Sequence, residues 1–271
     1  MASSEGLVVK GMAIRLLDLG AAGSAVLLEA WNGTGARGLA VARAGPEAFQ
    51  RLQAMAGGVL DQPFLAGESR WRRHLGEQPW LDDPGYWRAV GALEAALADL
   101  QARASGMPLW RWLGGAARRT VATARADPPA AIVVLEHPRP WTLLADSILA
   151  REFQLIAVDP IEWGGPEGVR RLDAIARAFQ LELALLEGVP VAPARALAIH
   201  LSFTTSMATW PLDASRPLLL EDAFVSADRL VAKDSGLPVP IASGLGVTIA
   251  EDRLAPHTGE RVVLGREISP A

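Results

Sequence analysis

The sequence predicts an α+β domain followed by a region of parallel α/β units. Residues 7–44 are rich in apolar, β-prone residues and contain the turn signal Asn32-Gly33, which is typical of a β-hairpin. Residues 89–105 carry the strongest helical pattern in the chain. After residue 115, short apolar runs alternate with helical stretches, and this alternation favours parallel strands joined by helices.

Two helices are expected in the first half of the chain. Residues 46–57 place Pro46 in a first helical turn and repeat apolar residues at helical spacing. The helix at 89–105 ends at Ser105-Gly106, with Pro108 just beyond. It carries a stripe of small residues that suits close packing against another element. The stripe consists of Ala92, Ala95, Ala96, Leu100 and Ala104.

The second half of the chain contains one clear amphipathic helix, at residues 167–179, among several strand candidates. The strand candidates are residues 120–126, 131–136, 142–147, 154–160 and 181–188. Residues 236–254 are rich in Gly and Pro, so an extended closing segment is expected there.

Composition narrows the class of protein and of partner. The chain has 271 residues, 50% of them hydrophobic, which allows a large core. The absence of cysteine excludes disulfides, thiolate metal ligands and cysteine nucleophiles. The net charge of −4 is spread over interspersed residues of both signs, so neither nucleic acid nor a membrane surface is an expected partner. No apolar run could cross a membrane and no secretory signal is read, so a cytoplasmic location is expected.

The basic residues are almost all arginine. Only Lys10 and Lys233 are lysines, which leaves 24 arginines among the 26 basic residues. Arginine pairs well with a carboxylate but is a poor proton acceptor, because its pKa lies above about 12. No lysine base is therefore available between residues 10 and 233.

Three blocks of sequence resemble the muconate-lactonizing and mandelate-racemase branch of the enolase superfamily. Residues 92–115, ALEAALADLQARASGMPLWRWLGG, look like the helix and turn that enter the barrel of those enzymes. Residues 157–180 resemble the sixth barrel strand, its Gly-Gly turn and the following helix. Residues 194–204 and 236–249 are similar to the last barrel helix and to the segment that returns to the cap domain.

The resemblance implies an α+β cap domain over a modified (β/α)8 barrel. A complete barrel takes about 250 residues, and at least about 200, whereas only about residues 120–230 are available here. We therefore expect a truncated TIM-like barrel with fewer than eight full units. The expected domains are a cap at residues 1–115, completed by a return segment at 231–271, and a reduced barrel at 116–230.

The missing strands carry much of the family's chemistry. By resemblance, the second and third strands would stand between Arg125 and Ile132, and they normally supply a Lys-x-Lys base and the first metal-binding aspartate. Glu136 resembles the second Mg²⁺ ligand, although a strand-end carboxylate in solvent or paired with Arg139 is the favoured interpretation. Asp146 resembles a remnant of the third ligand. Because Mg²⁺ requires nearly octahedral oxygen ligation, the sequence favours no bound Mg²⁺, with binding at Glu136 and Asp146 as the alternative.

Two residues are candidates for proton transfer. Asp159 matches the aspartate at the end of the sixth strand, which pairs with a histidine on the seventh strand in the racemase type. Leu186 stands near that histidine's place, so the pair is broken, and Asp159 could instead cap the loop before Pro160. His137 could exchange a proton at neutral pH, but it follows Glu136 directly, so the two would point to opposite faces of a strand.

Three functions remain open at this point. The first is a degenerate member of the family, a pseudoenzyme with a carboxylate-binding, assembly or regulatory role. The second is an active lyase, racemase or cycloisomerase in which Asp159, His137 or Glu187 replaces the lysine bases. The third is one subunit of a heteromeric enzyme. In each case a small carboxylate is the expected ligand, and a homo-oligomer is expected to cover the apolar flank that a shortened barrel would expose.

Overall fold

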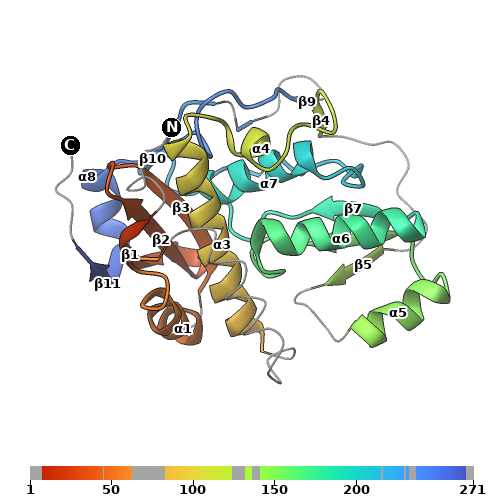
Figure 1. Cartoon of the computed structure of the whole chain (residues 1–271), viewed down its shortest axis with the longest axis horizontal. Helices are drawn as coiled ribbons and strands as arrows, with labels where there is room; N and C mark the ends of the chain where they lie inside the picture. The colour runs from red at the N-terminus through yellow and green to blue at the C-terminus, as the bar shows by residue number, and fades with distance from the viewer. Residues whose placement is uncertain are drawn as a thin grey trace.

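A four-stranded antiparallel sheet forms the N-terminal part of the molecule (Figure 1). The computed structural model describes residues 8–44, 46–62, 83–123, 132–135, 141–214, 216–228, 230–231 and 236–266. The order in the sheet is β11-β1-β2-β3, from Thr258–Gly265, Val9–Asp18, Ser24–Asn32 and Arg37–Arg43. A short 3-10 helix, Gly20–Ala22, joins β1 to β2.

The predicted hairpin lies between β2 and β3, and the side chain of Asn32 organises its turn. Asn32 Oδ1 accepts hydrogen bonds from the backbone N–H groups of Thr34 and Ala36, at 3.0 and 3.1 Å. Gly35 takes a positive φ of 84° in this turn, which glycine adopts without steric cost. The Asn-Gly signal therefore marked the correct turn.

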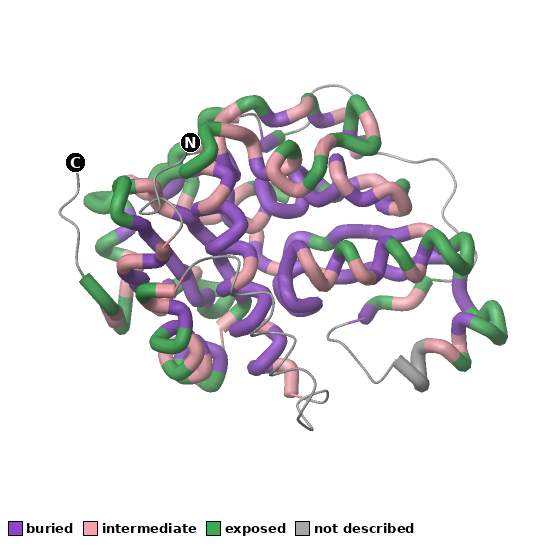
Figure 2. Tube along the Cα trace, in the orientation of Figure 1, coloured by how far each residue is buried: buried purple, intermediate pink, exposed green. Residues whose placement is uncertain are grey.

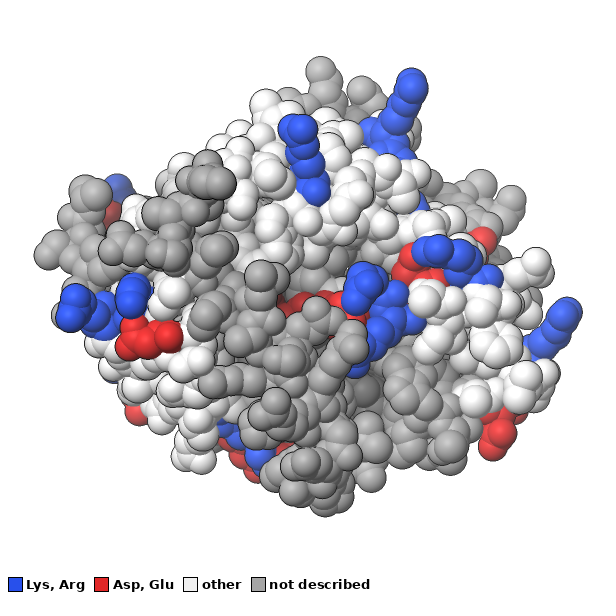
Figure 3. Space-filling model, in the orientation of Figure 1, with Lys and Arg blue, Asp and Glu red and all other residues white. Residues whose placement is uncertain are grey.

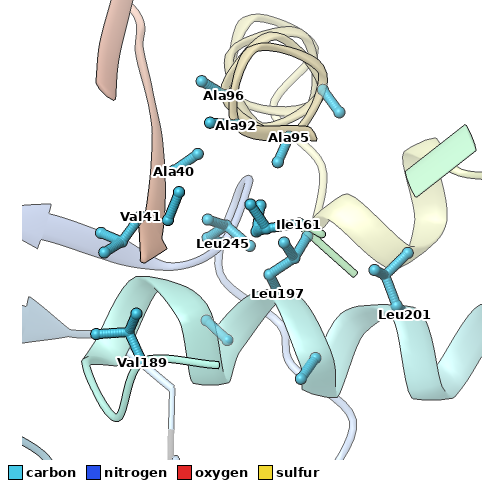
Figure 4. Packing of buried hydrophobic residues seen from close by; sticks show 14 of the residues in the cluster. Ala40, Val41, Ala92, Ala95, Ala96, Ile161, Val189, Leu197, Leu201 and Leu245 are labelled. Carbon is cyan, nitrogen blue, oxygen red and sulfur yellow. The ribbon is translucent and has the colours of Figure 1, made fainter. Parts of the chain in front are cut away.

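Helices α1 (Pro46–Ala56) and α3 (Pro84–Ala104) pack against this sheet. Asp83 caps α3 by accepting a hydrogen bond from Tyr86 N at 3.1 Å. The buried Ala92 and Ala96 of α3 lie on the side of the helix nearest Ala40 of β3, while Ala95 points toward Ile161 (Figure 4). The small-residue stripe therefore does allow close packing, although Ala104, at its end, is exposed.

A parallel sheet of order β5-β6-β7 follows, from Ile132–Leu135, Leu155–Val158 and Glu182–Leu185. Helix α6 (Gly165–Phe179) and helix α7 (Ala192–Thr204) follow β6 and β7 respectively, as the alternation of patterns predicts. Helix α6 begins after Gly164, whose φ is +81°.

The strand expected at residues 142–147 is wrong. This segment belongs to helix α5, Trp141–Leu149. Its sequence holds one β-branched residue, Thr142, whereas Leu143, Leu144 and Ala145 are good helix formers. The apolar run was short, and periodicity alone does not separate a buried strand from a helical turn. As a result β5 pairs directly with β6, with no strand between them.

The wall of the sheet continues beyond β7 without a regular strand. Leu183 N of β7 donates to Met207 O at 2.7 Å, and Trp210 N donates back to Leu183 O at 3.3 Å. Leu212 N then donates to Ala122 O of β4 (Val121–Ala122) at 3.0 Å. Residues 207–212 thus bridge β7 to β4, and β9 (Gly236–Leu237) pairs antiparallel with β4. The described strands form an open, shortened barrel wall, as expected.

The remaining elements return the chain to the first sheet. They are β8 (Phe224–Ser226), β10 (Val247–Ile249), α8 (Glu251–Leu254) and the 3-10 helix Ala255–His257, whereas α4 (Leu109–Trp112) lies between α3 and β4. Asp99 of α3 ties this return segment to the sheet, since it accepts hydrogen bonds from Leu245 N at 2.6 Å and Leu39 N at 2.8 Å. Buried residues are concentrated in the first sheet, α3, β6 and α7 (Figure 2). None of the described helices is long and apolar enough to cross a membrane.

Candidate functional site

Asp159 lies directly after β6, at the carboxyl end of the parallel sheet, where ligand sites of barrels and open α/β sheets occur. Its Oδ1 accepts a hydrogen bond from Ile161 N at 2.9 Å, so it does cap the following turn. Burial, and to a lesser extent the nearby Glu162 carboxylate, raise the pKa of Asp159 to about 7, against the opposing effects of the hydrogen bond from Ile161 N and of Arg43 and Arg88. A carboxyl group with such a pKa can exchange a proton near neutrality.

Leu186 is the neighbour of Asp159 on the next strand. The backbone ladder pairs Val158 with Leu185, and Leu186 N donates to Val158 O at 2.8 Å. Since side chains alternate along strands, Asp159 and Leu186 share the face of the sheet that also carries Ala157 and Ala184. The residue beside Asp159 on this face is therefore apolar and cannot exchange a proton with it.

A pocket of about 450 Å³ opens at this end of the sheet, beside Asp159. It lies between the ends of β5, β6 and β7, the segment after residue 207, and the ends of β3 and α3. Its lining residues are Arg43, Arg88, Val134, Leu135, Asp159, Glu162, Leu185, Leu186, Glu187, Gly188, Trp210, Pro211, Asp213 and Arg216. This volume lies within the range of ordinary small-molecule sites, about 300–1,000 Å³.

Two of the pocket carboxylates are held by arginines. Arg88 Nε lies 2.7 Å from both carboxylate oxygens of Glu162. Glu187 pairs with the fully buried Arg195, whose Nη2 donates to Glu187 Oε1 at 3.0 Å. Burial raises the pKa of Glu187, although the hydrogen bond from Arg195 opposes this shift. These ion pairs occupy oxygens that would otherwise be available to a ligand.

Two further arginines line the pocket with donors available. Arg43 Nε donates to Gly188 O at 2.9 Å. In the described part of the chain, its Nη groups and the side chain of Arg216 have no hydrogen-bond partner, and both residues are exposed. A guanidinium group matches the two oxygens of a carboxylate, so these side chains can receive an anionic ligand.

Helix α3 fixes the turn that follows Asp159. A Cβ added at Gly91 would lie 1.9 Å from Ile161 O, so the helix backbone touches the turn directly. Both carboxylate oxygens of Glu94 accept a hydrogen bond from Glu167 N at 3.0 Å, at the start of α6. Burial raises the pKa of Glu94 to about 8. The long helix of the N-terminal part therefore positions the loop that carries Asp159.

The other sequence candidates are not brought to this pocket by the described structure. Asp146 lies on α5 and is exposed, so it is not a strand-end ligand. Glu136 and His137 lie outside the described residues. His200 is fully buried in α7, where Trp110 N donates to its Nδ1 at 3.1 Å and burial lowers its pKa to about 3. It is a neutral core histidine.

The described residues do not fit the three-carboxylate Mg²⁺ site that the resemblance implies. No group of three or more His, Asp or Glu side chains among them is arranged to hold a metal ion. Asp159 faces the pocket, but Glu162 and Glu187 are each engaged by a guanidinium group. Mg²⁺ needs several oxygen ligands in nearly octahedral geometry, and these three carboxyl groups do not offer them.

Sequence reasoning missed the arginines and the glycine of this pocket. Arg43 ends β3, and Arg216 follows the bridging segment, so they are far from Asp159 in the sequence. Gly188 looked like an ordinary loop glycine. Glu162 was the one detectable signal, because it lies three residues after Asp159 in the block that resembles the sixth strand and its turn.

The face of the molecule drawn in Figure 3 has no extended area of one charge sign among its described residues. Blue and red side chains lie interspersed there among uncharged atoms. The described residues of this face offer no extended basic patch, in agreement with the mixed charge of the sequence.

Several solved structures share this fold. An isomerase from Streptomyces coelicolor A3(2) is 15% identical, with a TM-score of 0.74 over 92% of this chain and 98% of that chain. L-Talarate dehydratase from Polaromonas sp. JS666, complexed with Mg and L-glucarate, is 16% identical, with a TM-score of 0.72 over 96% and 99%. N-succinyl Arg/Lys racemase from Bacillus cereus ATCC 14579 is 11% identical, with a TM-score of 0.75 over 95% and 100%. At these identities the likeness shows the fold alone.

A family model supplies the remaining comparison. No curated protein matches the sequence. The family described as enolase C-terminal domain-like matches residues 91–253, which is more than half of the chain. The chain therefore belongs to the enolase superfamily, in the branch of mandelate racemase and muconate-lactonizing enzyme, with a shortened barrel.

Proposed function

We propose that this protein binds a small carboxylate in the pocket beside Asp159 and does not carry out the metal-dependent enolization of its family. The observation that carries the proposal is the arrangement of charge in the pocket. The Arg43 Nη groups and the Arg216 side chain make no hydrogen bond to another described residue, while Glu162 and Glu187 are neutralised by ion pairs with Arg88 and Arg195. The pocket is therefore suited to receive an anion rather than to bind a divalent cation.

Binding and chemistry are tested separately. Calorimetric titration with small carboxylates should show binding that weakens in Arg43→Gln and Arg216→Gln. The matched control is Arg253→Gln, since Arg253 is exposed on α8 and outside the pocket. Equal binding by all three variants would contradict the proposed site.

Mg²⁺ and Mn²⁺ titrations test the metal part of the proposal, with Glu136→Gln as the companion variant. We expect no specific metal binding in the wild-type protein. We also expect no metal-dependent exchange of the α-proton of 2-substituted carboxylates with solvent deuterium, followed by NMR. Exchange that requires Mg²⁺ and disappears in Glu136→Gln would overturn the proposal.

A second candidate function is metal-independent proton transfer by Asp159. It is favoured by one observation, the partly buried position of Asp159 and its pKa of about 7. An active enzyme of this kind would lose its activity in Asp159→Asn, and its kcat/KM would rise with pH through about 7. The same deuterium exchange assay without added metal distinguishes it from a binding protein.

A further inference from the structure

The pocket beside Asp159 has two unlike halves. One half carries the charged groups, which are Arg43, Arg88, Arg216, Asp159, Glu162, Glu187 and Asp213. The other half is apolar and is formed by the parallel sheet and the segment that bridges it to β4. Its residues are Val134, Leu135, Leu185, Leu186, Trp210 and Pro211.

The apolar half exists because the inner face of the sheet is left open. Val134 on β5 is 58% exposed and Leu186 after β7 is 38% exposed, although both lie on the face that a complete barrel fills with layers of side chains. Below them, Leu155, Ala157 and Ala184 form a small buried cluster against which Trp210 packs. The inner face of the sheet is therefore buried at Leu155, Ala157 and Ala184. Beside this cluster, Val134 and Leu186 form an exposed apolar wall.

Polar partners on this wall are few. On the inner face of β5, β6 and β7, the described residues with polar side chains are Asp159 and Glu182, and Glu182 lies at the opposite end of β7 from Asp159. Hydroxyl groups of a ligand that are turned from water toward Val134 and Leu186 would find no hydrogen-bond partner on these two side chains. Such desolvation is unfavourable, whereas an apolar group at the same position gains free energy by burial.

We propose that this pocket selects carboxylates that carry a compact apolar group, such as one aromatic ring or a branched alkyl chain, over polyhydroxylated acids. The carboxylate lies against Arg43 and Arg216, and the apolar group lies on the wall of Val134, Leu186 and Trp210. This inference rests on the proposed carboxylate binding and adds the class of ligand. The selection between the two classes of acid comes from the different solvation of the attached groups, because the carboxylate is common to both.

The test compares 3-phenylpropionate with D-gluconate, two acids that share the carboxylate and differ in the attached group. Calorimetry on the wild-type protein should show at least about tenfold tighter binding of 3-phenylpropionate, since burying even one or two methylene groups is worth about that factor. In Leu186→Asn this preference should fall by about tenfold. Leu149→Asn is the matched control, because Leu149 is exposed on α5 and outside the pocket.

The outcomes separate the two proposals. If gluconate binds as tightly as 3-phenylpropionate, or if Leu186→Asn leaves the preference unchanged, the inferred ligand class is wrong while carboxylate binding stands. If 3-phenyl-1-propanol binds as tightly as the acid, or if Arg216→Gln has no effect on either acid, carboxylate binding itself is refuted. Failure of both acids to bind refutes both proposals.

Discussion

Gly188 and Asp159 touch so closely that a Cβ added at Gly188 would lie 1.7 Å from Asp159 Oδ2. Gly188 lies in the loop after β7, and its carbonyl accepts a hydrogen bond from Arg43 Nε at 2.9 Å. The last residue of β3 thus holds this loop against the carboxyl group that follows β6. A residue of the antiparallel sheet thereby positions the wall of the pocket, although it is distant in sequence.

Gly188→Ala should disturb the pocket without unfolding the protein. The new methyl group cannot coexist with the present position of Asp159, so either the carboxyl group or the loop must move. We expect weaker carboxylate binding and a changed pKa of Asp159, measured by calorimetry and by NMR titration of its Cγ. In Gly57→Ala, where no atom lies within 4 Å of the added Cβ, neither quantity should change. An unchanged Asp159 titration in Gly188→Ala would show that the contact is not tight.

Asp159 should make the stability of the protein fall as pH rises. Its folded-state pKa of about 7 lies above its ordinary value, so the folded state binds more protons than the unfolded state between about pH 4 and 7. Asp159→Asn removes this difference. Relative to the variant, the wild-type protein should lose free energy of unfolding across this window, by a few kcal/mol in order of magnitude, and no more above it. Denaturant unfolding at pH 5, 6, 7 and 8 gives the slope, and parallel curves would contradict the raised pKa.

Glu94 should also make the stability of the protein fall as pH rises, over a pH window that extends to about 8. Burial and the neighbouring Glu167 raise its pKa to about 8, while Arg170 and Arg171 oppose the shift. Glu94→Gln keeps an oxygen acceptor for Glu167 N and removes the titration. The stability difference between wild type and variant should therefore still change between pH 7 and 8. Asp146→Asn, at an exposed position of α5, serves as the control and should leave the pH profile of the wild type intact.

Gly91→Ala sets helix propensity against packing. Alanine is favoured over glycine inside a helix by about 1 kcal/mol, so propensity alone predicts a more stable protein. The added Cβ would lie 1.9 Å from Ile161 O, which is backbone and cannot swing away. We expect a net loss of about 1–3 kcal/mol in the free energy of unfolding, as for other overpacked sites. A stabilised variant would show that the contact between α3 and the turn is loose.

Asp99→Asn should be strongly destabilising. The fully buried Asp99 carboxylate accepts hydrogen bonds from Leu39 N, Leu245 N and Arg103 Nε. In an asparagine, the side-chain NH2 group would face at least one of these N–H donors, and that hydrogen bond would be lost. Removing one partner of a buried ion pair costs about 3–5 kcal/mol. Thermal unfolding of Asp99→Asn should therefore begin well below that of the wild type. Asp252→Asn, at an exposed position, should melt with the wild type.

The sequence predicted the elements whose signals are local. Asn32 and its glycines mark the hairpin, and the spacing of apolar residues gives α1 and α6 with boundaries close to those observed. It gives the end of α3 as well, although this helix begins at Pro84 rather than at residue 89. Asp159 could be placed at the end of β6 because residues 157–180 resemble the sixth barrel strand and its turn. Residues 142–147 were misassigned because a short apolar run fits a helix as well as a strand.

The site was only half predictable because it is assembled from distant segments. Asp159 and Leu186 are recognisable from the strands that carry them. Arg43 and Arg216 are ordinary surface arginines in the sequence, and only the packing of β3 and of the bridging segment brings them to the pocket. No local sequence pattern indicates that these two arginines lie close together in the fold. The predicted oligomer and the cytoplasmic location stay predictions.

The pairing of β1 with β11 couples the two extremes of the described chain. Residues Gly11 to Arg15 pair with partners from Gly265 back to Arg261. On the ribosome, one side of β1 must therefore wait for β11, with its backbone N–H and C=O groups unpaired until residues 258–265 have been synthesised. This late pairing should make folding slow, because the chain between β1 and β11 must lose loop-closure entropy before the stabilising contacts form. Until then the edge of β1 is unpaired, so the nascent protein depends on protection of that edge.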